Sequence, residues 1–395
     1  MFSTPGDAPG VLRAMYNDSR RSQEALKMAD PRVTKLASVI AGYSLELKPG
    51  QQLWRRTTLL AEKLNLEIYT AAIKAGASVW VQQSIPGADE AFYKYGSDEQ
   101  LDFISPVRKL LVDTFDAMLV ILAEENTKSL AGVDPKRMAR VRKAGSPVTK
   151  TNMDRSAAGD FRWCVTLYPT PAMAQDANMS LGDYAEFVYA AGMLNEQDPV
   201  SFWKNEGTKQ RKLADWLKGH DRASLKGANV DIELSINDRT FEIADGKYNF
   251  PDGEIFTSPV EDSVNGWIRF KYPGIYGGQE VEDIQLWFEN GRVVKEQAGK
   301  NQELLTSLLN TDAGARVLGE WGIGTNYGIT HFSKNMLFDE KMGGTIHFAV
   351  GYGFPECGSH NESGLHWDML CDMADSEVRV DGELFYKNGK FAVAQ

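Results

Sequence analysis

The residues best suited to chemistry are histidines and carboxylates near the C-terminus. Four of the five histidines fall between residues 331 and 366. His366 and Asp368 stand two positions apart in HWD, and on a β-strand such residues point to the same face. An imidazole and a carboxylate placed in this way can bind one metal ion. The spacing therefore indicates a metal site, although an HxD triplet also occurs without one.

Three more candidate ligands stand among small or apolar neighbours. His347 lies in the middle of GGTIHFAVG, where an imidazole must be ligated, or hydrogen-bonded as an ordinary core histidine. Glu320, in GARVLGEWGIGTN, would be costly as an unpaired carboxylate, and a cation would remove that cost. Glu254 follows a Pro-Asp-Gly turn in FPDGEIFTSPVED, where an exposed turn carboxylate is the alternative.

Together these five residues offer mixed nitrogen and oxygen donors. Such a set suits zinc, cobalt or manganese, and it contains enough carboxylates to bridge two ions. Bridging requires that at least one carboxylate be shared. The residues alone allow a dinuclear hydrolase, but no spacing rule brings Glu254 next to His366.

Other kinds of active site are not indicated. Gly76 stands alone as a helix-stop glycine, so the first half has no phosphate-binding glycine motif. No GxSxG motif exists, and Ser258 has no histidine close to it in the sequence. With 43 basic against 54 acidic residues the formal charge is −11, which disfavours a phosphate-binding surface. We therefore expect no nucleic-acid partner.

Composition predicts a soluble protein of a reducing compartment. The chain has 395 residues, more than one hydrophobic core usually organises, so two domains are expected. Its three cysteines are too few and too scattered for a disulfide framework. The N-terminus has no apolar segment after a basic start, and nowhere do about 18 apolar residues run together. We expect a cytoplasmic protein that is not attached to a membrane.

The first half has the alternating pattern of an α/β domain. An arm over residues 1–30, rich in Ser, Pro, Gly and charge, is expected to be flexible. Repetition of strand, helix and strand then indicates a mainly parallel sheet with helices on both faces. The expected strands span 52–56, 77–82, 117–123 and 162–167, and the expected helices 31–43, 60–75, 98–103 and 135–144, followed by a helical segment over 180–218.

After Gly227 the pattern changes to short alternating strands joined by turns such as Asn290-Gly291. A boundary near residue 225 gives an α/β domain over 31–225 and an α+β domain, rich in antiparallel strands, over 226–395. The expected strands of this second domain span 231–236, 240–244, 267–272, 284–289 and 343–350, with a helix at 301–309 and a terminal hairpin around Asp381-Gly382. All five candidate ligands fall in it.

Four segments resemble, in order, the metal-site segments of the thermophilic metalloaminopeptidases of the T and S types. They are NFPDGEIFTSPVEDSVNG, TDAGARVLGEWGIGTN, LFDEKMGGTIHFAVG and SGLHWDMLCD, and upstream YSLELKPG, GVDP and LYPTPAMAQDANMSLGDY resemble the family's first domain. The resemblance implies an N-terminal α/β domain, a C-terminal metal-binding catalytic domain and a homodimer. It also implies removal of N-terminal amino acids from peptides with two divalent ions per subunit.

Carried over by motif, the metal ligands would be Glu254, Glu320, His347, His366 and Asp368, the same residues that chemistry singles out. By the same likeness a carboxylate among them would also orient or deprotonate the attacking water, and Glu320 is our choice.

One position departs from the family pattern. Family members often carry a tyrosine after the histidine strand, where it is thought to stabilise the tetrahedral intermediate, and here that place holds Phe354. Tyr352 lies two residues earlier and faces the same side if the segment is extended. We therefore expect Tyr352 to supply the missing hydroxyl as a catalytic residue.

Two other functions compete with a metal-dependent aminopeptidase. A ring-cleaving dioxygenase would use His347, His366 and Asp368 as an iron triad, and would need neither Glu254 nor Glu320. A catalytically silent dimer that binds peptides or metal is the third hypothesis, motivated by Phe354.

Overall fold

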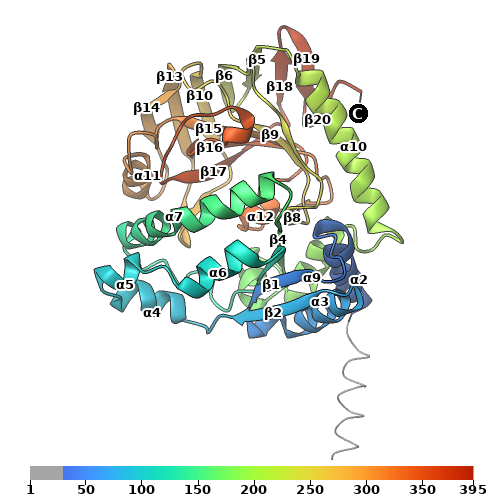
Figure 1. Ribbon diagram of the computed structural model, residues 1–395. Coiled ribbons are helices and arrows are strands. Elements are labelled where there is room, and N and C mark those ends of the chain that lie inside the picture. Colours follow the sequence, from blue (N-terminus) through green and yellow to red (C-terminus); the bar gives the residue numbers. More distant parts are fainter. Residues whose placement is uncertain (1–29, 395) are drawn as a thin grey trace, which may run out of the picture.

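The computed structural model describes residues 30–394, so the predicted flexible arm lies outside it apart from Asp30. The two halves of the chain are stacked, with the N-terminal half below and the C-terminal half above in Figure 1. Helix α10 (Pro199–Leu217) rises along one side from the lower half to the upper. None of the helices in the described part is long and apolar enough to span a membrane.

The N-terminal half contains a five-stranded sheet in the order β2-β1-β3-β4-β8, and every pair in it is parallel. Parallel neighbours need long crossover connections, which helices supply here. The prediction of a mainly parallel sheet is therefore confirmed. The strands are β1 (Gln52–Thr57), β2 (Ser78–Gln83), β3 (Ala117–Leu122), β4 (Arg162–Leu167) and β8 (Asn249–Phe250).

Three of the helices in this half begin at the pair Asp-Pro, at Asp30, Asp134 and Asp198. Each aspartate accepts a backbone hydrogen bond from the first turn, and proline at the first helical position lacks only an N–H that would have no partner. The other elements are α2 (Pro31–Val39), η1 (Ile40–Ser44), η2 (Leu59–Ala61), α3 (Glu62–Lys74), α4 (Ala88–Tyr95), α5 (Asp98–Asp102), α6 (Pro106–Thr114), α7 (Pro135–Ala157), α8 (Pro171–Asp176) and α9 (Leu181–Ala191).

Helix α7 is longer than the sequence predicts. The expected helix ended at residue 144, before Gly145 and Pro147, but α7 continues through both to Ala157. Val148, one turn beyond the expected end, is buried in a small core with Trp54 and Leu111. Packing of this second part of the helix thus outweighs the local preference for a break.

The C-terminal half consists of two antiparallel sheets with one core between them. Ile232 and Leu286 of the larger sheet and Trp321 and Phe348 of the smaller sheet all belong to that core. The larger sheet has the order β14-β13-β10-β6-β5-β18-β19-β20 and the smaller β17-β16-β15-β9-β7, while β11 and β12 form a separate hairpin. The antiparallel second half is confirmed.

The bounds of these elements follow the expected pattern of short strands. They are β5 (Arg222–Gly227), β6 (Val230–Ser235), β7 (Glu242–Ala244), β9 (Glu254–Thr257), β10 (Asn265–Phe270), β11 (Gly274–Tyr276), β12 (Gln279–Val281), β13 (Ile284–Glu289), β14 (Arg292–Gln297), α11 (Gln302–Leu309), β15 (Leu318–Gly324), α12 (Met336–Asp339), β16 (Thr345–Gly351), η3 (Pro355–Cys357), β17 (His366–Asp372), β18 (Ser376–Val380), β19 (Glu383–Lys387) and β20 (Lys390–Phe391).

Each half of the chain contributes residues to the core or sheet of the other half. Strand β8 extends the parallel sheet of the N-terminal half beside β4, and Phe338 of α12 lies in the N-terminal core 5.5 Å from Phe187 between ring centroids. In the other direction, Leu213 of α10 belongs to the C-terminal core. A division of the chain near residue 225 therefore stays a prediction.

A glycine sets the spacing of the smaller sheet. Gly322 of β15 pairs with His347 of β16, and a Cβ built at Gly322 would lie 2.0 Å from Cε1 of that imidazole. Any side chain at this position must push the imidazole or the strand aside.

We predict that Gly322→Ala lowers the free energy of unfolding of the metal-free protein by about 1–3 kcal/mol, the usual cost of overpacking a dense site. Urea denaturation followed by circular dichroism measures the change. Gly132→Ala is the matched control, because a Cβ there meets no atom within 4 Å. Equal stability of the two variants would show that the strand yields without cost.

Candidate metal centre

One face of the smaller sheet carries all five predicted ligands. Side chains alternate along a strand, so Glu320, His347, and the pair His366 and Asp368 share a face across β15, β16 and β17. The residues between them point into the apolar core; they include Trp321, Phe348 and Met369. The strand register thus gives the smaller sheet one polar face, which carries the candidate ligands, and one hydrophobic face, which lies in the core.

The candidate ligands form two groups that share Glu320. Glu254, Glu320 and His347 make the first group, and Glu320, His366 and Asp368 make the second, each with one ligand atom per residue within 4.8 Å of the others. Glu320 Oε1 lies 3.4 Å from His347 Nε2, and Glu320 Oε2 lies 3.2 Å from His366 Nε2. One carboxylate therefore offers one oxygen to each group, as a bridge between two ions requires.

Backbone carbonyls fix the orientation of both imidazoles. His347 Nδ1 lies 3.0 Å from the carbonyl oxygen of Glu340, and His366 Nδ1 lies 2.9 Å from that of Tyr352. A ring that donates its Nδ1 proton to a carbonyl leaves Nε2 free as a ligand atom when it is neutral. In both rings Nε2 is the atom that faces the carboxylates.

Without an ion this face attracts protons. Burial disfavours protonation of His347, yet its hydrogen bond to Glu320 and the charge of Glu254 raise its pKa to about 10. Burial opposes protonation of His366 too, but the charge of Asp368 and the Glu320 hydrogen bond raise its pKa to about 10. Burial would raise the pKa of Glu320, and the two imidazoles overcome it and lower that pKa to about 2. Positive charge stabilises the site, whether a proton or a cation supplies it.

In the described part of the chain, each ligand group contains one buried carboxylate oxygen without a hydrogen bond. Glu254 Oε2 and Asp368 Oδ1 are buried, and neither has a hydrogen-bond partner among the described residues. One belongs to each ligand group, so each group contains a buried acceptor that a cation would satisfy. The donor set, the orientation of the imidazoles and these two oxygens all fit a divalent metal centre.

The two groups differ in their access to solvent. The side chains of His347 and Glu254 are 1% and 8% exposed, whereas those of His366 and Asp368 are 29% and 14% exposed. The side of His366 and Asp368 is therefore the more open to solvent.

A buried lysine beside the first group is not predicted from the sequence. The side chain of Lys341 is fully buried, with Nζ 3.5 Å from Glu254 Oε1 and in contact with the Glu340 carboxylate. Burial would lower the pKa of Lys341, but the charges of Glu254 and Glu340 raise it instead. The run DEKMGGT has the pattern of an exposed charged turn, and its position directly before the strand of His347 is the only signal that could have revealed it.

Tyr352 and Phe354 lie at the exposed end of the site. The Phe354 ring packs edge-on against the His366 imidazole with centroids 5.2 Å apart, and the Tyr352 ring lies 6.1 Å from that of Phe354. None of the described residues hydrogen-bonds to the Tyr352 hydroxyl, which is half-buried. The hydroxyl is therefore available to another partner.

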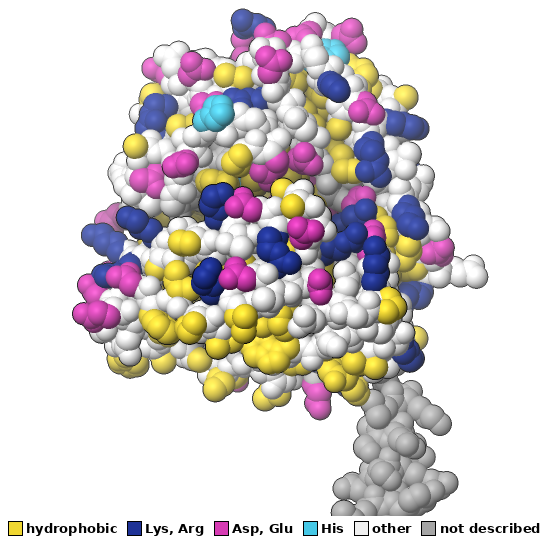
Figure 2. Space-filling view, in the orientation of Figure 1, with side chains coloured by type: hydrophobic (Ala, Val, Ile, Leu, Met, Phe, Trp, Pro, Cys, Tyr) yellow, Lys and Arg dark blue, Asp and Glu magenta, His cyan; other side chains and the backbone are white. Residues whose placement is uncertain are grey.

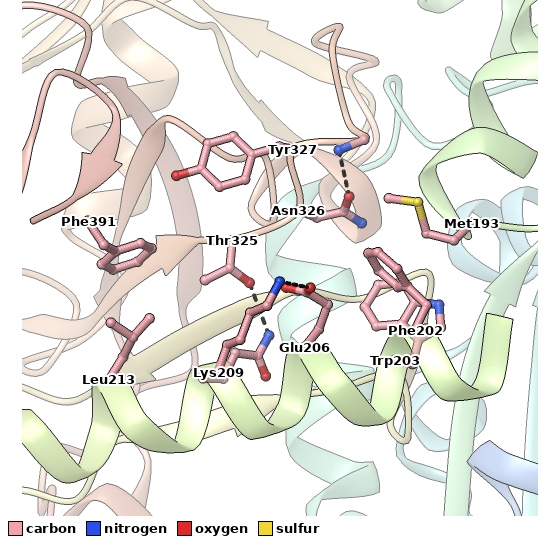
Figure 3. Close-up of a pocket in the computed structure, with 13 residues that line it drawn as sticks. Met193, Phe202, Trp203, Glu206, Lys209, Leu213, Thr325, Asn326, Tyr327 and Phe391 are labelled. Atoms are coloured by element: carbon pink, nitrogen blue, oxygen red, sulfur yellow. Dashed lines mark hydrogen bonds and ion pairs between the residues drawn. The ribbon is translucent and has the colours of Figure 1, made fainter. Parts of the chain in front are cut away.

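A separate cavity of about 390 Å³ lies beside α10, outside the metal centre (Figure 3). Phe202, Trp203 and Leu213 give it an apolar wall, and the ion pair of Lys209 with Glu206 lies along the helix. None of the predicted site residues lines it.

On the face of the molecule in Figure 2, acidic and basic side chains intermingle along the band where the two halves meet.

Known proteins resemble this chain over most of its length. The family model described as thermophilic metalloprotease (M29) matches residues 29–391. Aminopeptidase 2 of Geobacillus stearothermophilus is 25% identical over 405 residues, covering 91% of this chain and 95% of the relative. The solved structure of wild-type AmpT from Thermus thermophilus superposes with a TM-score of 0.80 at 23% identity, covering 92% of this chain and 99% of that one.

A dioxygenase shares the fold more distantly. The structure of 2,5-dihydroxypyridine dioxygenase from Pseudomonas putida KT2440 has a TM-score of 0.55 at 15% identity, covering 92% of this chain and 97% of that one. Likeness at this level concerns the fold alone. The match of the family model over nearly the whole chain decides the assignment: this chain belongs to the M29 family of thermophilic metalloproteases.

Proposed function

We propose that the protein is a metal-dependent aminopeptidase, which removes N-terminal amino acids from peptides. The observation that carries the proposal is the pair of ligand groups sharing Glu320 on one sheet face. The name of the G. stearothermophilus relative, an aminopeptidase, supports the choice of substrate.

In this proposal Glu254, Glu320 and His347 hold one divalent ion, and Glu320, His366 and Asp368 hold the other. Zinc, cobalt or manganese suits these donors. Ions bound there would polarise the scissile carbonyl and lower the pKa of a bound water towards about 7.

The chain's own residues complete the site. Glu320 engages both imidazoles, so we assign it the bridging position, and its expected second role in orienting or deprotonating the water stays a prediction. The partly exposed carboxylate of Asp368 is suited to the substrate's free amine, which is positively charged. Tyr352 remains our candidate for the hydroxyl that stabilises the oxyanion.

The geometry weighs against an iron triad of His347, His366 and Asp368. Among the described residues the two histidines fall into different ligand groups, with the Glu320 carboxylate between them. A triad would leave that buried carboxylate without a role.

A silent dimer is excluded only by activity. Homodimerisation and a cytoplasmic location rest on resemblance and composition, and both stay predictions.

We predict a metal content approaching two ions per subunit at saturating zinc or cobalt, together with hydrolysis of an aminoacyl anilide. Elemental analysis of the dialysed protein and the rate of anilide release measure the two quantities. One iron per subunit with no response to zinc or cobalt would favour the dioxygenase. Two bound ions without hydrolysis of any aminoacyl substrate would favour the silent dimer.

We predict that His347→Ala and Asp368→Ala each abolish peptidase activity and each reduce the metal content, while the protein stays folded. Each substitution removes a donor from one group without removing apolar core packing. Circular dichroism tests the fold, and His360→Ala, at an exposed histidine of the same half, is the control. Global unfolding of both variants would mean that the two residues are structural.

We predict that Tyr352→Phe lowers kcat by about 10²-fold to 10³-fold with little change in KM, because a hydrogen bond to the oxyanion strengthens only in the transition state. Phe354→Tyr should then add little. The opposite pattern, a silent Tyr352→Phe and a faster Phe354→Tyr, would make Tyr352 a packing residue. No change in either variant would leave oxyanion stabilisation to the metals.

A further inference from the structure

Lys341 is a positive charge already built into one end of the metal centre. Its side chain is 0% exposed, and its ammonium group lies 3.5 Å from Glu254 Oε1 and against the Glu340 carboxylate. Glu254 Oε2, the other oxygen of the same carboxylate, is 3.4 Å from His347 Nε2 and has no hydrogen-bond partner among the described residues. One oxygen of Glu254 thus lies near Lys341, and the other lies near His347 of the first ligand group.

No comparable cation lies at the second group. Among the described residues, the ion pairs of His366 and Asp368 are limited to each other and to Glu320. The second group is also the more exposed, so water can relax around an ion bound there, whereas the first group faces Lys341 in the buried interior. Like charges repel far more strongly in that environment than at the surface.

We propose that Lys341 makes the two metal positions unequal, so that the group Glu320, His366 and Asp368 binds its divalent ion tightly and the group Glu254, Glu320 and His347 binds the second ion weakly. The inference rests on the proposed dinuclear centre and goes beyond it by ranking the positions. Lys341 touches no reacting atom in this scheme. It acts through Glu254 by neutralising part of that carboxylate's charge from 3.5 Å away.

Titration of the metal-free, full-length protein with Zn²⁺ tests the proposal by isothermal calorimetry, and the absorption of bound Co²⁺ gives a second readout. The wild type should show one tight and one weak step. Lys341→Met should tighten the weak step by at least about tenfold, because a buried like charge is removed, and leave the tight step unchanged. Lys341→Gln, which removes the charge but keeps a hydrogen-bond donor for Glu340, guards against a Met variant that fails to fold.

Three further variants make the result specific. Lys271→Met removes an exposed lysine of the same half and should change neither step. Asp368→Ala should remove the tight step, and Glu254→Gln the weak one.

Two indistinguishable steps in the wild type, or a weak step that loosens in both Lys341 variants, would overturn the proposal; loosening would show that the lysine serves only to position Glu254. A wild type that binds no Zn²⁺ or Co²⁺ at all would overturn the dinuclear centre itself, and is recognised by the absence of both steps.

Discussion

Five ionisable side chains share one face of a small sheet whose other face is hydrophobic core. Burying their charges is costly, and the rest of the site compensates for that cost. A carboxylate such as Glu320, 5% exposed, is costly to bury unless positive charge lies next to it. Two imidazoles provide that charge as protons in the metal-free chain, which is why their pKa values rise to about 10. Divalent ions would provide it more fully, because their charge is larger and each coordinates several oxygens at once.

Room for such ions comes from residues with a very small side chain or none. Gly322 lies directly against the His347 imidazole, and Ala349 is the residue between Glu320 and Asp368 across the three strands. A larger residue at either place would close the space between the carboxylates. Glycine in a strand usually weakens a β-sheet, but the site requires it at position 322.

Alternation along a strand is local, so the sequence predicts which candidate ligands share a face, but it says nothing about which strands meet. HxD spacing places His366 and Asp368 on one face without further information, whereas Glu254 reaches His347 only through the pairing of β9 with β15 and β15 with β16. Lys341 was missed for the same reason. Its burial depends on contacts with residues far away in the chain, and a charged turn gives no hint of them.

The N-terminal half contributes to the metal centre without lending it a ligand. The loop that leads from β15 to Lys341 passes through the N-terminal core, where Asn326 donates hydrogen bonds to the carbonyl oxygens of Ala191 and Asp252, and Phe338 packs against Phe187. Backbone pairing of Asn326 with Lys341 then fixes the lysine beside Glu254. The buried end of the centre is thus held by the packing of one half against the other, and near the open end Arg142 of α7 donates a hydrogen bond to the carbonyl oxygen of Gly364, two residues before His366.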